Sequence, residues 1–130
     1  QGGVKRQYMF VKDAVDAYLT IGKSISESPD VANTKAREGA YAECAYNVGS
    51  SEACIRTTRE MLHLLQDMMD TDVAAVERPR PVHAEDQPNH QYVDSEKIKK
   101  ELGWAAHTEL GSGLRETIAW YQAYLASGGG

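Results

Sequence analysis

Residues 92–125 read YVDSEKIKKELGWAAHTELGSGLRETIAWYQAYL, and this stretch predicts two helices joined by a tight turn. Asp94 and Ser95 can accept hydrogen bonds from the free amides of a first helical turn, so they predict where the first helix starts. Gly103 suits the left-handed residue that ends a helix, and Trp104 follows where a hydrophobic side chain can fold back on the last turn. We therefore expect Trp104 to be buried between the two helices.

The second predicted helix has one continuous apolar face. Thr108 is expected to cap this helix through its side-chain oxygen. Its apolar residues recur every three or four positions, as on one side of a helix. They are Leu110, Leu114, Ile118, Tyr121 and Leu125. Such a face is stabilised only when it is removed from water, so we expect it to pack on a partner surface.

The upstream residues predict shorter elements. Residues 7–11 and 45–48 are expected to form strands, and Asp13 is expected to cap a helix that ends near Gly22. Thr57 or Thr58 with Glu60 has the pattern of a capping box. The methionines and leucines of residues 61–69 form a broad stripe, which predicts the most buried helix. The three prolines between residues 79 and 88 exclude a regular helix there and predict a loop.

Composition limits the kind of protein. With 130 residues, 42% of them hydrophobic, we expect a single domain over residues 1–127, with a mobile loop or insertion at 24–40 and a flexible tail at 128–130. A formal charge of −5 argues against a nucleic-acid surface. The sequence has neither a long apolar run nor a secretory leader, so a cytoplasmic protein without a membrane contact is expected. Cys44 and Cys54 match no ligand or redox spacing and are expected to be reduced.

Three segments resemble one enzyme family and follow its order. Residues 91–104 (QYVDSEKIKKELGW) and 113–121 (GLRETIAWY) form the longest match. Residues 6–18 (RQYMFVKDAVDAY) match an arginine, a short strand and a "V-x-D-x-V-x-A" helix start, and residues 46–50 (YNVGS) match an "N-V-G-S" strand end. The family is the extended short-chain dehydrogenases that act on nucleotide sugars, which include 4,6-dehydratases and 4-epimerases. The resemblance covers the chain except for residues 24–40.

The resemblance implies an α/β fold. The chain is similar to the C-terminal, substrate-binding lobe of these enzymes, in which a few short strands are covered by about four helices. The glycine-rich half that binds the dinucleotide is not matched by any part of the sequence. A nucleoside-diphosphate sugar is the implied partner.

The resemblance also implies site residues. Arg6 stands where the family places an arginine that contacts the substrate diphosphate, and the planar fork of arginine suits two phosphate oxygens. An exposed arginine near the end of the chain explains Arg6 equally well. A second family arginine lies about ten residues before the aspartate equivalent to Asp94. Ungapped counting reaches Ala84, whereas four inserted residues recover Arg80.

The polar residues 86–91 resemble the "N-E-I-x-x-Q-Y" type of the family, which can lack that second arginine. Asp86, Gln87, Asn89 or His90 would then meet hydroxyls of the ribose or the base. Ordinary loop polarity explains these side chains equally well. The predicted substrate-binding set is Arg6, Arg80, Asp86, Gln87 and Asn89.

The chemistry of the family is absent from this sequence. No GxxGxxG or GxGxxG occurs to hold a nicotinamide dinucleotide. Tyr8 and Lys12 have the YxxxK spacing of the family's proton-transfer pair, but they lie in a segment matched to another motif. We therefore expect no catalytic residue, metal or cofactor in this chain, and NAD(P) only in the intact parent enzyme.

Two hypotheses follow. The first is a nucleotide-sugar-binding C-terminal part of an NAD(P)-dependent 4,6-dehydratase or epimerase. The second is a stand-alone, non-catalytic α/β interaction module derived from that lobe. In the second case the apolar surface that normally meets the dinucleotide-binding half would be exposed, and self-association is expected.

Overall fold

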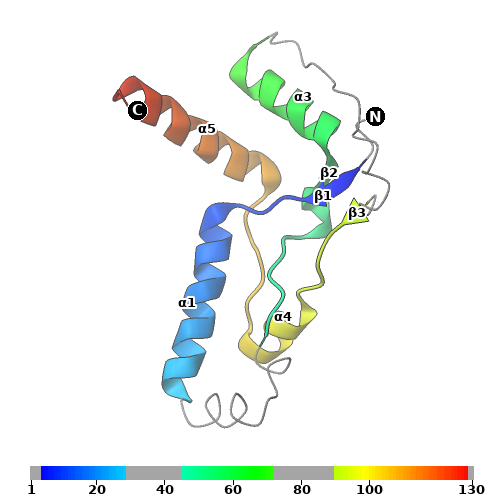
Figure 1. The fold of residues 1–130 in the computed structure, drawn as a ribbon, viewed down its shortest axis with the longest axis vertical. Coiled ribbons are helices and arrows are strands. Elements are labelled where there is room, and N and C mark those ends of the chain that lie inside the picture. Colours follow the sequence, from blue (N-terminus) through cyan, green and yellow to red (C-terminus); the bar gives the residue numbers. More distant parts are fainter. Residues whose placement is uncertain (1–3, 29–44, 72–89, 129–130) are drawn as a thin grey trace, which may run out of the picture.

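The computed structural model describes residues 4–28, 45–71 and 90–128 (Figure 1). The elements follow in this order: β1 (Lys5–Gln7), α1 (Val11–Glu27), the short 3-10 helix η2 (Glu52–Cys54), β2 (Ile55–Thr57), α3 (Thr58–Met69), β3 (His90–Gln91), α4 (Glu96–Leu102) and α5 (Leu110–Ala126). The predicted α/β fold, with a few short strands and about four helices, is confirmed for these ranges.

The sheet has the order β2-β1-β3, so β1 is its central strand. β1 pairs antiparallel with β2, where Arg6 lies opposite Arg56. It pairs parallel with β3, where Arg6 lies beside Gln91. The predicted strand at 7–11 is wrong, because the chain leaves the sheet after Gln7 and enters α1 at Val11. Residues 45–48 form no strand either, since they find no strand partner in the described part of the chain.

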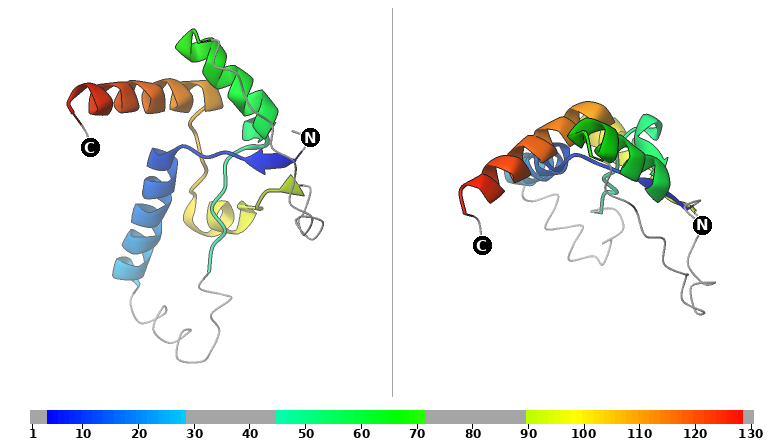
Figure 2. Two further views of the ribbon diagram at one scale, coloured as in Figure 1. Left: turned by 45° about the horizontal axis from the view of Figure 1, so that its top comes forward. Right: turned by 90° about the horizontal axis from the view of Figure 1, so that it is seen from above.

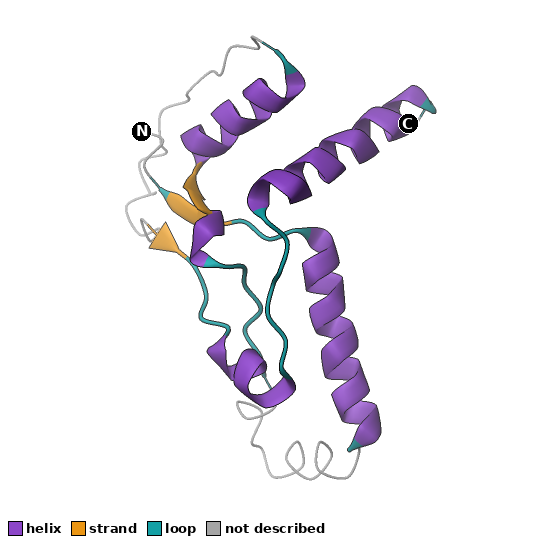
Figure 3. Cartoon of the chain, turned by 180° about the vertical axis from the view of Figure 1, so that it is seen from behind, coloured by secondary structure: helices purple, strands orange, loops and turns teal. Residues whose placement is uncertain are grey.

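The helices form two pairs around the sheet. In Figure 1, α3 and α5 lie above the sheet, whereas α1 and α4 lie below it. The views in Figures 2 and 3 show the same division from other sides, with a long extended connection leading from α4 to α5. Each helix pair thus packs on its own side of the small sheet.

The core lies between α1 and α4. Ile98 is fully buried (0% exposed), and Ala17 and Trp104 (4% exposed) pack with it. Partly buried residues surround this cluster: Met9, Ile21, Tyr46, Val48, Leu102 and Ala106. The predicted burial of Trp104 is confirmed. The prediction that it packs between the last two helices is wrong, because its buried partners Ala17 and Ile98 lie on α1 and α4 and no residue of the cluster lies on α5.

Two predicted helix caps bond to each other instead. α1 begins at Val11 and α5 at Leu110, so neither Asp13 nor Thr108 is a cap. Asp13 is buried at 1% exposure, and its carboxylate accepts from the Thr108 amide (3.1 Å) and hydroxyl (2.8 Å). His107 Nδ1 lies 3.3 Å from the same carboxylate. These contacts fasten the start of α1 to the connection between α4 and α5.

α1 is longer than predicted. It passes through Gly22 and ends at Glu27, so residues 24–27 are helical rather than part of a mobile loop. A glycine inside a helix costs only about 1 kcal/mol relative to alanine, which is too little to end a helix that continues favourably. Lys23 forms an ion pair with Glu27 over this last turn. The rest of the predicted loop, from residue 29, lies outside the described residues.

The predicted end of α4 is confirmed, whereas its predicted caps bond differently. Gly103 has the left-handed φ of 71° that ends α4. Asp94 lies one residue before the N-cap, Ser95, and its Oδ1 accepts from the amide of Glu96 at 2.7 Å, so it is not the cap of α4. Ser95, in contrast, makes no capping bond, because its hydroxyl accepts from the amide of Gly49 at 2.8 Å. The first turn of α4 is thereby attached to the 45–50 segment.

α3 is capped as predicted, and a larger share of its residues is at least partly buried than in the other described helices. Thr57 Oγ1 accepts from the amide of Glu60 at 3.1 Å, and the Glu60 carboxylate accepts from the amide of Thr57 at 2.7 Å. Of the residues of α3, only Met61 is buried. The remaining apolar side chains of the stripe are partly exposed, and two of them, Leu65 and Met69, line a groove. Cys54, just before β2, is buried and free, whereas Cys44 lies outside the described residues.

Replacing Trp104 with alanine should destabilise the protein by about 3–5 kcal/mol, because a large buried aromatic side chain is removed from the main core. The matched control is Trp120→Ala, because Trp120 is 58% exposed on α5 and surface changes usually stay within about 0.5 kcal/mol. Chemical denaturation of both variants measures the difference. Equal midpoints would show that Trp104 does not hold the core.

Glu60 makes the cap of α3 sensitive to pH. The Thr57 amide, and then the Thr57 hydroxyl, lower the pKa of the Glu60 carboxyl from its usual 4.5. The ionised Glu60 carboxylate therefore stabilises the protein fully above pH 4.5, and this stabilisation is lost as pH falls through the lowered pKa. Glu60→Gln should be less stable than the parent at pH 6, and the difference should shrink toward pH 3. A difference that stays constant over this range, measured by thermal melts, would contradict this assignment.

Candidate functional site

A cavity of about 550 Å³ lies at the carboxyl ends of the two parallel strands, β1 and β3. Three segments line it, namely the end of β1, the turn after residue 48 and the end of β3. The lining residues are Arg6, Gln7, Met9, Val48, Gly49, Ser50, Gln91, Tyr92 and Val93. In α/β proteins, ligands bind at the carboxyl ends of parallel strands. The cavity is therefore the first candidate for a binding site.

Arg6 supplies the positive charge of this cavity. It is half-buried in the central strand, and its Nη1 donates to the Lys5 carbonyl at 3.1 Å. A guanidinium has five N–H donors, so this one bond leaves most of them for a ligand. The sequence-based assignment of Arg6 to a binding site is thus compatible with its position, and its contact with a diphosphate stays a prediction.

A second arginine lies directly across from Arg6. Arg56 is its register partner on β2, and side chains of such partners share one face of the sheet. Its Nη1 donates to the Ile55 carbonyl at 2.7 Å, and its charge also reaches Glu60, whose pKa it helps to lower. The sequence alone did not indicate Arg56, because only the pairing of β1 with β2 brings the two arginines together.

Gln7 connects the other two walls of the cavity. Its Nε2 donates to the Ser50 carbonyl at 2.6 Å, and its Oε1 accepts from the Val93 amide at 3.0 Å. Gly49 lies against the same side chains. A Cβ placed on Gly49 would come within 2.6 Å of Val93 Cγ2 and 2.7 Å of Gln7 Oε1. The "N-V-G-S" motif therefore has a glycine where three segments meet closely.

The hydroxyl of Ser50 is an unsatisfied polar group. Ser50 Oγ is buried and has no hydrogen-bond partner, although Ser50 lines the cavity. A buried hydroxyl without a partner is unfavourable by about 1–3 kcal/mol. Ser50 therefore has an unused donor and acceptor close to the cavity.

Most of the predicted site residues cannot be placed. Arg80, Asp86, Gln87 and Asn89 lie outside the described residues, and only Arg6 is found at the cavity. The lining residues Gln7, Ser50, Gln91 and Tyr92 were not predicted as site residues. All four lie within the matched motifs, so the motifs themselves were the signal for them.

The described residues do not fit a nicotinamide dinucleotide. Such a cofactor needs a glycine-rich turn from a strand into a helix, whose free amides receive the pyrophosphate. The connections from β1 to α1 (residues 8–10) and from β3 to α4 (residues 92–95) contain no glycine. β2 passes directly into α3, and Thr57 and Glu60 already occupy the amides at that junction. In the described ranges, no group of three or more histidine, cysteine, aspartate or glutamate residues could hold a metal ion. Nor does any helix there have the length and apolarity to cross a membrane.

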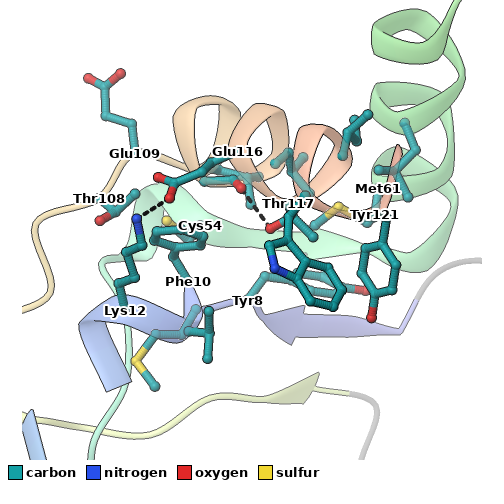
Figure 4. A pocket seen from close by; sticks show the side chains of 18 of the residues that line it. Tyr8, Phe10, Lys12, Cys54, Met61, Thr108, Glu109, Glu116, Thr117 and Tyr121 are labelled. Atoms are coloured by element: carbon teal, nitrogen blue, oxygen red, sulfur yellow. Dashed lines mark hydrogen bonds and ion pairs between the residues drawn. The ribbon is translucent and has the colours of Figure 1, made fainter. Parts of the chain in front are cut away.

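A larger groove of about 1030 Å³ separates α3 from α5. Figure 4 shows Phe10 and Tyr8 beneath α5, with Lys12 of α1 reaching Glu116 in an ion pair. All five residues of the predicted apolar face of α5 line this groove. The helix is confirmed, but its face is only partly covered, since Leu125 remains 67% exposed. The groove therefore offers a mainly apolar surface, with polar side chains around it.

Replacing Ser50 with alanine should leave the free energy of unfolding unchanged or slightly raised, because the substitution removes a buried hydroxyl that has no partner. Thr57→Ala is the matched control, since that hydroxyl is bonded and its loss should cost about 1 kcal/mol. Urea denaturation of both variants makes the comparison. A loss at Ser50 as large as that at Thr57 would show that the Ser50 hydroxyl is bonded.

Known proteins resemble this chain over most of its length. A dTDP-glucose 4,6-dehydratase of Neisseria meningitidis serogroup B is 33% identical over 91 residues, which is 65% of this chain and 25% of the relative. One of Escherichia coli is 27% identical over 128 residues, or 95% of this chain and 31% of the relative. The chain thus spans about a quarter to a third of the length of these curated relatives. No protein-family model matches the sequence.

Part of a solved structure has the same fold. The Bordetella bronchiseptica enzyme WbmF, crystallised in complex with NAD+ and UDP, superposes with a TM-score of 0.61. The match covers 98% of this chain and 32% of WbmF, at 22% identity. At that identity the likeness speaks for the fold alone. The sequence matches confirm the predicted resemblance: over most of its length, this chain is homologous to dTDP-glucose 4,6-dehydratases.

Proposed function

We propose that this chain is the nucleotide-sugar-binding, C-terminal part of an NAD(P)-dependent 4,6-dehydratase or epimerase. The observation that carries the proposal is the cavity at the ends of β1 and β3, where Arg6 and the unsatisfied Ser50 hydroxyl both lie. The matched relatives are named for a reaction on dTDP-glucose, and the structural neighbour was crystallised with UDP. A nucleoside diphosphate is the chemistry common to both.

Arg6 serves this binding through its charge. A diphosphate is anionic, and a half-buried guanidinium can donate two parallel hydrogen bonds to its oxygens. Arg56 on the neighbouring strand adds a second positive charge on the same face of the sheet. The Ser50 hydroxyl would meet a polar atom of the ligand. We assign Arg80, Asp86, Gln87 and Asn89 to the remainder of this site, on the resemblance alone.

The reaction itself belongs to the rest of the parent enzyme. Bound NAD(P) supplies the hydride transfer in such enzymes, and the residues described here do not fit that cofactor. We therefore assign this chain no catalytic residue. Its part is to hold the nucleotide end of the substrate so that the sugar reaches the other half.

A second candidate function is a stand-alone interaction module. The groove between α3 and α5 favours it, since an apolar surface of this size suggests a protein-protein contact. Self-association through this face is the outcome that would support it. Sedimentation of the parent and of Leu125→Lys at several concentrations tests the idea. A parent that remains monomeric at high concentration, like the variant, would refute self-association.

Arg6→Ala should weaken the binding of UDP or dTDP to this chain by about tenfold or more, because one charged hydrogen bond contributes about 1.5–3 kcal/mol. Affinity of the parent should be only about millimolar, since contacts from the rest of the enzyme are missing. It should also fall with salt, because exposed charges are screened over about 8 Å at physiological ionic strength. Chemical-shift titration at two salt concentrations measures these effects.

The matched control is Arg115→Ala, which removes an exposed arginine of α5 that does not line the cavity. It should bind like the parent. Binding that is unaffected by Arg6→Ala and by salt would place the nucleotide elsewhere and contradict the proposed function.

A further inference from the structure

We propose that Gln7 is a positioning residue that clamps the two walls of the cavity, and so sets the opening into which the nucleotide fits. The ligand in this inference rests on the proposed function. The clamp itself rests on the geometry of Gln7. No contact of Gln7 with a ligand is required, because it acts through the two segments it joins.

The side chain of Gln7 forms hydrogen bonds just beyond the end of the sheet. β1 ends at Gln7 and β3 at Gln91, so the backbone ladder between them stops at the cavity. Two residues after the end of β3, the amide of Val93 donates to Gln7 Oε1 at 3.0 Å instead of to a strand carbonyl. On the opposite wall, Gln7 Nε2 donates to the Ser50 carbonyl at 2.6 Å. One amide group thus joins segments 43 and 86 residues away.

The chemistry of the partners determines which way the amide faces. The Ser50 carbonyl can only accept and the Val93 amide can only donate, so nitrogen must face Ser50 and oxygen must face Val93. A glutamate of the same shape could still accept from Val93. As a carboxylate, however, it has no hydrogen to donate to Ser50, and two oxygens would then face each other.

The close packing around Gly49 is independent support for the clamp. Its amide is held by Ser95 Oγ, and a Cβ at this position would come within 3.0 Å of both Gln7 and Val93. The walls are therefore packed closely on the side of the clamp. Adding one methyl group in Gly49→Ala must push Gln7 or Val93 aside, and so must change the cavity without removing any polar group.

The experiment compares Gln7→Glu with Gln7→Met, a variant of similar length that makes neither bond. UDP is the probe, and its affinity is measured by chemical-shift titration at pH 7 and pH 4, beside the parent at each pH. At pH 7 both variants should bind about tenfold more weakly than the parent. At pH 4 the protonated carboxyl group introduced by Gln7→Glu regains a donor, so only this variant should return toward the parent. A purely structural loss would not recover in acid.

Amide hydrogen exchange tests the clamp independently of ligand binding. The Val93 amide should be protected in the parent and in Gln7→Glu, and should exchange faster in Gln7→Met. Gly49→Ala should also weaken UDP binding while circular dichroism shows a folded chain. A Val93 amide that exchanges equally in all variants, or unchanged UDP affinity in Gln7→Met, would overturn the clamp. If the parent binds no UDP but the exchange pattern holds, the clamp stands and the proposed function fails.

Discussion

The carboxylate of Asp13 lies inside the protein, and the connection between α4 and α5 is folded around it. A buried carboxylate is strongly unfavourable unless hydrogen bonds replace its water. The Thr108 amide and hydroxyl supply two such bonds, and His107 lies beside them. These contacts bring the end of the chain back to α1 and direct α5 across Phe10. The groove and the core both depend on this crossing, because it sets where α5 starts relative to α1.

The candidate site depends on a second set of short-range contacts at the end of a very small sheet. β1 pairs over only three residues with β2 and over two with β3, so backbone bonds alone hold the cavity walls weakly. Side chains complete the structure there. Gln7 joins Ser50 to Val93, and Ser95 holds Gly49. A site built in this way can be preorganised for a nucleotide even though the sheet itself is short.

Much of the fold could be predicted from local patterns. The Gly103 helix end, the Thr57 capping box and the burial of Trp104 are set by residues close in sequence, and all three are confirmed. Asp13 and Thr108 were misread as caps, because both have capping chemistry and only the fold shows that they bond each other over 95 residues. The length of α1 was underestimated because Gly22 was read as a stop.

The candidate site could be predicted only in part. Arg6 was found through a family motif, and the structure puts it at a cavity. Arg56 could not be predicted, because strand register, and not sequence spacing, brings it next to Arg6. The apolar face of α5 was read correctly as a helix face. Its incomplete burial could not be foreseen, because a periodic pattern does not say whether the chain contains the surface that covers it.

The central claim is that a nucleotide binds at the ends of β1 and β3. Intermolecular nuclear Overhauser effects between UDP and the isotopically labelled chain test it most directly. The account predicts contacts from the nucleotide to Ser50, Gln91 and Tyr92, which line the cavity. Contacts confined to Leu114, Ile118 and the rest of the groove between α3 and α5 would contradict it.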